Sequence, residues 1–344
     1  MLFRLLLAAT FSAFAANASL YFFGDSLTDS GNVAKATSVL NRYTLGGVPK
    51  HPSSPYVGGA FTNGPVWAEH VAARFGSPQD AEPAGMSMGW LGRVGGSGNN
   101  YAVGGARTDS GGALGFLDFV LPTGVFQQVD FYLSGTGGNA DAEGLYFMLA
   151  GGNDLRDAAR ISDPYERMMA AQQAGINIAY SVQRLYFAGA RKFVLINAPD
   201  VGLTPESIGD GIVGAGTDAS RQFNTWLGLY AAYLPSVPDF SLQYFDLFGL
   251  HHDLVAEYGL GSVRPCKDGP PEMCDQTLFF DSVHPNARVH GIIGNSIADQ
   301  LLATSSPAYL SSDAREIQNP EPSTILLTLS AGVALLALRR RRAS

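Results

Sequence analysis

The sequence of 344 residues is poor in cysteine, lysine and charged residues in general. It contains two cysteines, four lysines beside 18 arginines, and 15% charged residues, with a formal net charge of -8 at pH 7. Two cysteines exclude a framework of several disulfides. The basic residues form no stripe in the body of the chain, and this excludes a nucleic-acid-binding surface. No internal repeat stands out.

Apolar residues and glycine are abundant by contrast. Hydrophobic residues make up 46% of the chain, which is ample for a sizeable core and excludes a disordered or fibrous protein. The 41 glycines are about 12% of the residues, against a usual share of about 7%. This excess indicates many loops and close backbone approaches.

The N-terminal residues 1–18 have the order of a secretory signal peptide. Arg4 precedes the apolar residues 5–14, and the small-residue pattern of residues 16–18 (Ala-Asn-Ala) follows. We therefore expect cleavage by signal peptidase after Ala18. A buried N-terminal helix is the alternative.

The C-terminal residues 320–344 combine a Pro-Glu-Pro start, an apolar stretch at 325–338 and four arginines at 339–342. The stretch is shorter than the roughly 20 residues of a membrane span, and the arginines would stay on the cytoplasmic side. This arrangement resembles the PEP-CTERM sorting signal of Gram-negative bacteria. The resemblance implies transient membrane association, processing by an exosortase-type enzyme, and export to the periplasm, outer surface or extracellular matrix. A plain tail anchor is the alternative.

Between the two ends, the sequence predicts one domain at residues 19–303 and a polar linker at 304–319. Without residues 1–18 and 323–344, 17 basic and 30 acidic residues remain, a net charge of -13. Such a body is not attracted to anionic lipid or nucleic acid.

Short apolar runs alternate with helical patterns along this domain. We expect buried strands at residues 20–23, 145–150, 193–196 and 242–245, and helices at 164–188, 219–234 and 287–302. Strands separated by long helices predict a parallel sheet covered on both faces. The chemistry of such a sheet lies beyond the carboxyl ends of its strands.

Polar and glycine-rich motifs follow two of these strands, lie between them and precede the last helix. They are Phe-Gly-Asp-Ser-Leu-Thr-Asp-Ser-Gly-Asn at 23–32, Asn-Asn-Tyr-Ala-Val-Gly-Gly-Ala at 99–106, Gly-Gly-Asn-Asp at 151–154 and Phe-Asp-Ser-Val-His-Pro-Asn at 280–286. A nucleophilic serine needs an imidazole base and an acid that orients the imidazole. Of the six histidines, only His284 has a carboxylate three residues earlier, Asp281, and Pro285 suits the first turn of the following helix.

An ester-cleaving site also needs donors for the oxyanion. The side-chain amide of Asn153, the backbone N–H of Gly104 or Gly105, and the backbone N–H of Ser26 at the end of the first strand are the candidates.

Together these blocks resemble the GDSL-type members of the SGNH hydrolase superfamily, over residues 20–302. The element Asn-Gly-Pro-Val-Trp at 63–67 is closer to the lipase-like branch. The resemblance implies that Ser26 is the nucleophile, His284 the general base and then acid, and Asp281 its orienter. It assigns the oxyanion hole to Ser26, Gly104 and Asn153, with Gly105 in place of Gly104 as the alternative. The implied fold is a three-layer α/β/α flavodoxin-like sandwich with a five-stranded parallel sheet, without a metal or cofactor.

Three further features of the sequence are ambiguous. Residues 85–89 match Gly-x-Ser-x-Gly, the nucleophile elbow of another hydrolase fold, but a polar segment with Pro83 precedes them, so we expect Ser87 in a loop. His251 and His252 are adjacent, point apart and have no evident third ligand, so no metal is expected. A group of apolar residues lines an acyl pocket or caps the core; these are Phe116, Phe119, Val120, Leu121 and Phe126.

The two cysteines, Cys266 and Cys274, stand shortly before Asp281. In an exported protein they predict a disulfide worth about 2 to 3 kcal/mol, which would stiffen the approach to the catalytic loop. Two free thiols are the alternative.

The sequence thus predicts an exported carboxylic ester hydrolase that forms an acyl-enzyme with a small-molecule or glycan ester. One alternative is a polysaccharide O-acetyl esterase that acts on matrix glycans. Another is a catalytically idle surface or matrix protein on the same scaffold. The sequence leaves the acyl length, the alcohol and the oligomeric state open.

Overall fold

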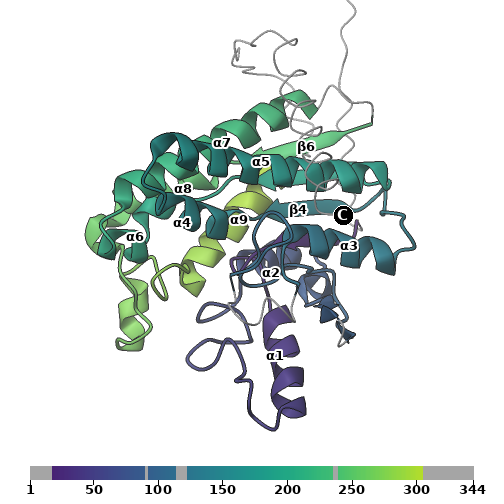
Figure 1. Ribbon diagram of the computed structural model, residues 1–344, viewed down its shortest axis with the longest axis horizontal. Coiled ribbons are helices and arrows are strands. Elements are labelled where there is room, and N and C mark those ends of the chain that lie inside the picture. Colours follow the sequence, from purple (N-terminus) through teal and green to yellow (C-terminus); the bar gives the residue numbers. More distant parts are fainter. Residues whose placement is uncertain (1–17, 90–91, 114–121, 235–238, 305–344) are drawn as a thin grey trace, which may run out of the picture. The chain divides into compact units, whose positions relative to one another are not determined.

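The computed structural model describes residues 18–89, 92–113, 122–234 and 239–304 (Figure 1). The predicted sorting segment, nearly all of the predicted signal peptide and linker, and four of the five acyl-pocket candidates (Phe116, Phe119, Val120 and Leu121) lie outside these residues. Within them, no helix combines the length and the hydropathy that crossing a membrane requires.

The central sheet consists of parallel strands in the order β1-β4-β5-β6. They are β1 (Leu20–Gly24), β4 (Leu145–Leu149), β5 (Lys192–Ile196) and β6 (Ser241–Phe245). All four occur where the apolar runs predicted them, with ends shifted by at most one residue. Phe22 pairs with Phe147, and Phe147 with Val194, so the aromatic and branched side chains of neighbouring strands stack in rows across the sheet.

This sheet has four strands in the described part of the chain, and the expected fifth strand is absent there. The extended segment 99–103 lies at its place, along the outer edge of β1. The N–H of Phe22 donates to the Asn99 carbonyl (3.0 Å), and the N–H of Tyr101 to the Phe22 carbonyl (2.7 Å). The pairing is interrupted at Gly24, whose N–H donates to the Gln128 side chain (2.9 Å), and one further bond follows, from Val103 N–H to the Gly24 carbonyl (3.1 Å).

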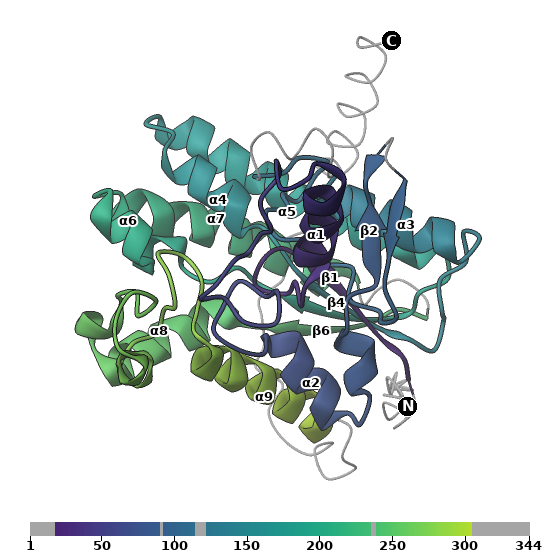
Figure 2. The ribbon, with the colours of Figure 1, turned by 90° about the horizontal axis from the view of Figure 1, so that it is seen from below.

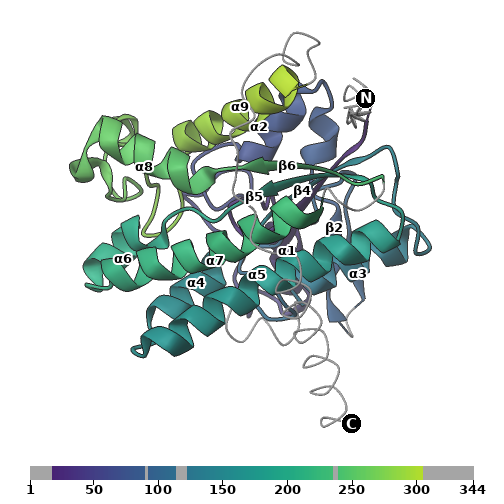
Figure 3. The same ribbon diagram turned by 90° about the horizontal axis from the view of Figure 1, so that it is seen from above.

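Helices cover both faces of the sheet and make three layers, as expected (Figure 3). One face packs against α2 (Trp67–Arg74), α8 (Leu247–Tyr258) and α9 (Ala287–Thr304). The other face packs against α3 (Val125–Gly135), α4 (Gly152–Ala159), α5 (Pro164–Phe187) and α7 (Val213–Tyr233). Successive side chains of β1 point to opposite faces of the sheet. Phe22 therefore packs on the face covered by α2, α8 and α9, and Phe23 on the face covered by α3, α4, α5 and α7.

A smaller third cluster lies beside β1. It joins α1 (Asn32–Tyr43) to the antiparallel pair β2 (Gly85–Ser87) and β3 (Arg93–Gly95) through Val33, Phe61 and Met86 (Figure 2). Ser87, expected in a loop, is the last residue of β2. The strand was missed because it has only three residues.

The ends of the long helices lie within two residues of the predicted positions, except for the start of α7. Helix α5 lacks only the last predicted residue, and α9 begins as predicted at residue 287 and ends at Thr304, beyond the predicted residue 302. Helix α7 begins six residues earlier than predicted, at Val213. Its first turns contain Gly214 and Gly216, which are weak helix formers. Gly216 is required by packing, because a Cβ there would lie 2.7 Å from the backbone of Gly202.

Candidate active site

The turn after β1 presents Ser26 at the carboxyl edge of the sheet. Gly24, at the end of the strand, lies so close to β4 that a Cβ on it would be 2.2 Å from the Leu149 carbonyl oxygen. The Asp25 carboxylate then accepts the N–H of Leu27 (3.0 Å), which closes a tight turn around Ser26. Burial raises the pKa of Asp25 to about 6, although the N–H groups of Leu27 and Gly152 bind the charged form.

Ser26, His284 and Asp281 form a continuous hydrogen-bonded chain. His284 Nε2 lies 2.7 Å from Ser26 Oγ, and His284 Nδ1 lies 2.7 Å from Asp281 Oδ2. The other carboxylate oxygen of Asp281 accepts the backbone N–H groups of Val283 (2.8 Å) and His284 (2.7 Å). The three-residue spacing thus bends the loop so that one carboxylate holds both the backbone and the ring of His284.

A fourth donor to Asp281 comes from a distant loop. The Tyr56 hydroxyl donates to Asp281 Oδ2 at 2.7 Å, so this oxygen serves Tyr56 and His284 together. Burial acts to raise the pKa of Asp281. This effect of burial is outweighed by the hydrogen bonds from His284, Tyr56 and Val283 and by the charge interaction with His284. The pKa of Asp281 therefore lies well below its usual range. Asp281 is therefore ionised and can stabilise a positive charge on the imidazole.

Asn153 lies at the start of α4, directly after β4, and is 8% exposed. One N–H of its side-chain amide donates to the Ala106 carbonyl (2.9 Å), and its oxygen accepts from Arg156 (3.2 Å). Two further hydrogen bonds, of 2.7 and 2.6 Å, hold the Arg156 guanidinium on Glu206. Arg156 thus fixes the amide so that its second N–H remains available to a ligand.

The two adjacent glycines differ in what their N–H groups bind. Gly104 N–H donates to the buried Asp29 carboxylate at 2.8 Å. Gly105 has φ +80°, a conformation that favours glycine, and its N–H has no acceptor within the described residues. The first choice from the sequence, Gly104, therefore has its donor occupied. The alternative, Gly105, has an N–H that is available to a ligand.

Asp29 also fixes the nucleophile turn from the other side. Its carboxylate accepts the N–H groups of Gly31 (2.7 Å), Asn32 (2.6 Å) and Val33 (3.2 Å) at the start of α1, in addition to Gly104. A single buried side chain thus ties the loop after β1 to the glycine pair.

A cleft opens over Ser26 and holds about 410 Å³, counting the part open to solvent. The groups that line it come from the segments after β1, β4 and β5 and from the loop before α9; they are Asp25, Ser26, Leu27, Gly152, Asn153, Arg156, Pro199, Val201, Thr204, Val283 and His284. An ester carbonyl in this cleft would meet the serine, the imidazole and the Asn153 amide together.

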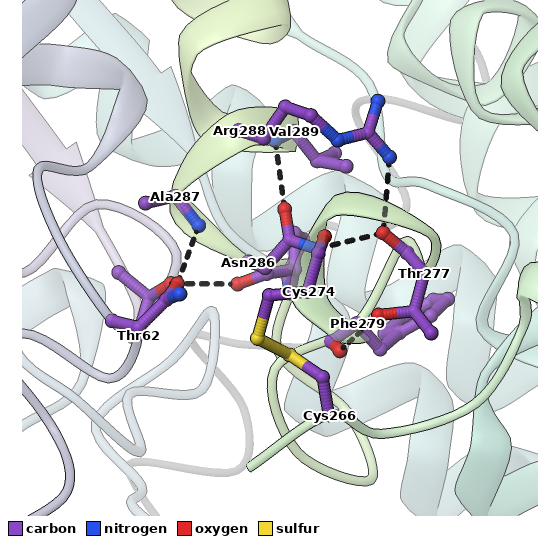
Figure 4. The surroundings of a disulfide bond; sticks show 11 residues. Thr62, Cys266, Cys274, Thr277, Phe279, Asn286, Ala287, Arg288 and Val289 are labelled. Carbon is purple, nitrogen blue, oxygen red and sulfur yellow. Dashed lines mark hydrogen bonds between the residues drawn. A yellow bond between two sulfur atoms is a disulfide. The ribbon is translucent and has the colours of Figure 1, made fainter. Parts of the chain in front are cut away.

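The loop that carries Asp281 and His284 is braced from both sides (Figure 4). Cys266 and Cys274 form a disulfide. The Asn286 amide donates to the carbonyls of Cys274 (2.9 Å) and Thr277 (2.7 Å), while its oxygen accepts the N–H of Val289 at the start of α9 (3.0 Å). The disulfide loop, the catalytic loop and α9 are therefore connected through one side chain.

Several other candidates lie apart from this cleft. His252 Nε2 pairs with Asp200 (2.9 Å), and His251 is buried separately. In the described ranges, no group of three or more His, Cys, Asp or Glu side chains is placed to hold a metal. The Phe126 ring packs on Tyr180 of α5, so the one acyl-pocket candidate that the structure describes belongs to helix packing.

Sequence reasoning missed Tyr56, Asp29 and Arg156. Tyr56 gives no local signal because its partner is 225 positions away. Asp29 lies within the motif at 23–32, and the signal for it was a second carboxylate in that motif. Arg156 lies shortly after the motif at 151–154, and the signal for it was a cation three residues after Asn153.

A parallel α/β sheet with a Ser–His–Asp constellation at its carboxyl edge is the arrangement that serine hydrolases have. The sequence matches the GDSL-like Lipase/Acylhydrolase family over residues 20–297, and the chain belongs to this family of ester hydrolases. It is thus a carboxylic ester hydrolase.

Individual relatives are distant. The chain is 27% identical to the GDSL esterase/lipase At1g71691 of Arabidopsis thaliana, covering 80% of each chain. It is 28% identical to Lipase 1 of Photorhabdus luminescens over 55% of this chain, but spans only 23% of that relative. Among solved structures, Est24, a carbohydrate acetylesterase from Sinorhizobium meliloti, is 17% identical with a TM-score of 0.41, covering 83% of this chain and 99% of Est24.

Proposed function

We propose that the chain cleaves esters through an acyl-enzyme on Ser26. His284 Nε2 takes the proton of Ser26 Oγ while that oxygen attacks the ester carbonyl carbon, and the carbonyl π electrons move to its oxygen. When the tetrahedral intermediate collapses, the bond to the alcohol oxygen breaks, and the proton on Nε2 passes to the leaving alkoxide. The acyl group remains on Ser26.

The second half of the reaction uses the same groups. His284 takes a proton from a water molecule, whose oxygen attacks the acyl carbonyl. The second intermediate collapses to the free acid, and the proton returns to Ser26 Oγ. Asp281 remains ionised throughout, holds the imidazole in the tautomer that accepts at Nε2, and stabilises the imidazolium.

The oxyanion of both intermediates is proposed to bind three N–H donors: the backbone N–H of Ser26, the backbone N–H of Gly105 and the side-chain amide of Asn153. Neither backbone group has an acceptor within the described residues, and Asn153 retains an N–H. Loss of one such donor typically reduces the rate about 10²- to 10³-fold.

The observation that carries this proposal is the 2.7 Å contact between His284 Nε2 and Ser26 Oγ. Ser26→Ala is expected to abolish hydrolysis of p-nitrophenyl acetate and butyrate and labelling by a fluorophosphonate, with little change in Tm. Ser87→Ala is the matched control, because it removes the serine of the Gly-x-Ser-x-Gly segment. Retained turnover in Ser26→Ala, or loss of labelling in Ser87→Ala, would contradict the assignment.

We further propose that the enzyme is exported and sorted through residues 320–344. The support is the order of segments at both ends of the sequence, and a disulfide suits an oxidising compartment. In a Gram-negative host, the processed protein should begin at Ser19 and lie outside the cytoplasm. Deleting residues 320–344 should change its location without changing this N-terminus. Uncleaved protein in the cytoplasm would refute export.

A further inference from the structure

A second pocket, which we call the Leu27 pocket, lies beside the catalytic cleft. Four residues line both spaces: Leu27, Pro199, Thr204 and Val283. Leu27 follows the nucleophile and Val283 precedes His284, so the boundary between the two spaces is built from the neighbours of the catalytic residues. The two spaces therefore adjoin beside Ser26 and His284.

The wall of the Leu27 pocket is almost entirely apolar. Its deeper part is formed by α8 and α9, including Leu254 and Ile293, and by Phe279 of the catalytic loop. Counting its open part, the pocket encloses about 490 Å³. An apolar acyl chain gains free energy from such a wall, whereas a sugar hydroxyl would lose its hydration there.

Three polar side chains line this wall: Asp200, Thr204 and His251. Asp200 accepts hydrogen bonds from Gly202 and Thr217, and Thr204 donates to the Val201 carbonyl, whereas His251 differs from both. His251 of α8 is 8% exposed, and neither of its ring nitrogens has a hydrogen-bond partner within the described residues. Its ring packs against Phe279, with 5.8 Å between the centroids. Burial lowers the pKa of His251 to about 4, so the imidazole is neutral and offers one donor and one acceptor.

A buried imidazole without partners needs an explanation, because an unpaired polar group in an apolar site is costly. A hydroxyl group also has one donor and can accept, so a single hydroxyl can pair with either nitrogen of the ring. A charged substituent does not suit this apolar wall.

We propose that the Leu27 pocket is the acyl subsite and that His251 selects acyl chains which carry a hydroxyl group. This inference rests on the proposed function, because it takes Ser26 as the atom that carries the acyl group. On this proposal, Ile293 of α9 influences the preferred length of the acyl chain, and His251 of α8 selects for the hydroxyl group.

The chain-length part is tested with the unmodified p-nitrophenyl esters from acetate to dodecanoate. Each methylene that becomes buried should raise kcat/KM about three- to fourfold, so octanoate should exceed acetate. Ile293→Ala enlarges the pocket and should raise the dodecanoate-to-octanoate ratio. Ile297→Ala is the matched control, because it truncates a buried isoleucine one turn further along α9 that does not line the pocket.

The hydroxyl part is tested with octanoate esters hydroxylated at successive carbons. One isomer should exceed plain octanoate in kcat/KM by about tenfold, the usual worth of one well-placed hydrogen bond. In His251→Leu this ratio should fall to about one.

Either of two results would overturn the inference. If Ile293→Ala and Ile297→Ala show the same chain-length profile, the pocket does not hold the acyl chain. If no isomer is preferred, or the preference survives in His251→Leu, His251 does not select hydroxyl groups and binds only buried water. In both cases acetate hydrolysis would still depend on Ser26, whereas failure of the proposed function would show as turnover by Ser26→Ala.

Discussion

The hydrogen bond from Tyr56 to Asp281 offers a sharp test of how the catalytic loop is positioned. Asp281 Oδ2 accepts from Tyr56 (2.7 Å) and from His284 Nδ1 (2.7 Å). Tyr56→Phe removes the first donor and keeps the ring, which packs edge-on against Phe280 with 5.2 Å between the centroids. The change is thus confined to one hydroxyl group.

The expected magnitude follows from the surroundings of Asp281. A hydrogen bond to a charged group contributes about 1.5 to 3 kcal/mol. Three other hydrogen bonds to Asp281 remain in Tyr56→Phe. We therefore expect the lost interaction free energy to lie near the lower limit of this range. A barrier increase of about 1.4 kcal/mol lowers kcat about tenfold. KM should change little, because Tyr56 does not line the catalytic cleft.

The assay is steady-state hydrolysis of p-nitrophenyl butyrate, with Tm measured in parallel. Tyr21→Phe is the matched control, since the Tyr21 hydroxyl donates to Asp141 (3.3 Å) from the amino end of β1, away from Ser26. It should leave kcat and KM unchanged. A wild-type kcat in Tyr56→Phe, or an equal loss in both variants, would refute a positioning role for Tyr56.

Three further predictions concern the orienting carboxylate, the close approach before the nucleophile and a buried acid. Asp281→Asn should lower kcat by about 10³- to 10⁴-fold, because the amide holds the imidazole in the wrong tautomer; a wild-type kcat would mean that another carboxylate orients it. Gly24→Ala should lower Tm by about 4 °C or more, as followed by circular dichroism, because its Cβ would lie 2.2 Å from the Leu149 carbonyl oxygen; an unchanged Tm would contradict this packing. Burial raises the pKa of Asp154 to about 7, against the hydrogen bonds that Thr108 donates to it, so the folded state binds this proton more tightly than the unfolded state. Its contribution to stability is therefore full below pH about 4 and is lost as pH rises through about 7, by up to about 4 kcal/mol. Urea unfolding should show that the free energy of unfolding falls less between pH 5 and pH 8 in Asp154→Asn than in the wild type. An equal fall in both proteins would contradict the prediction.

Features encoded within short windows of sequence were predictable. The strands are runs of apolar residues closed by glycine or polar motifs, so β1 and β4 were placed to within one residue. The Asp281–His284 pair was recognisable because the carboxylate and the imidazole lie one loop turn apart. The serine and the amide of Asn153 followed from their places at strand ends.

Features that depend on contacts between distant segments were not predictable. The choice between Gly104 and Gly105 depends on which N–H reaches Asp29, 75 positions away. The expected fifth strand is interrupted because the Gly24 N–H, which would continue the pairing, donates to the side chain of Gln128, 104 positions away. A single sequence contains no trace of such pairings.

The segment at residues 99–103 has a consequence for the behaviour of the protein in solution. A terminal strand of an open sheet presents unpaired backbone groups that can recruit another chain and start aggregation. Here the segment caps the outer side of β1 from Phe22 to Gly24, where Val103 N–H donates to the Gly24 carbonyl (3.1 Å). The same stretch leads directly into Gly104 and Gly105, and the second of these is the proposed oxyanion donor. A substitution that detaches residues 99–103 from β1 should therefore lower the activity and also expose the unpaired backbone groups of β1. Activity and solubility should then decline together.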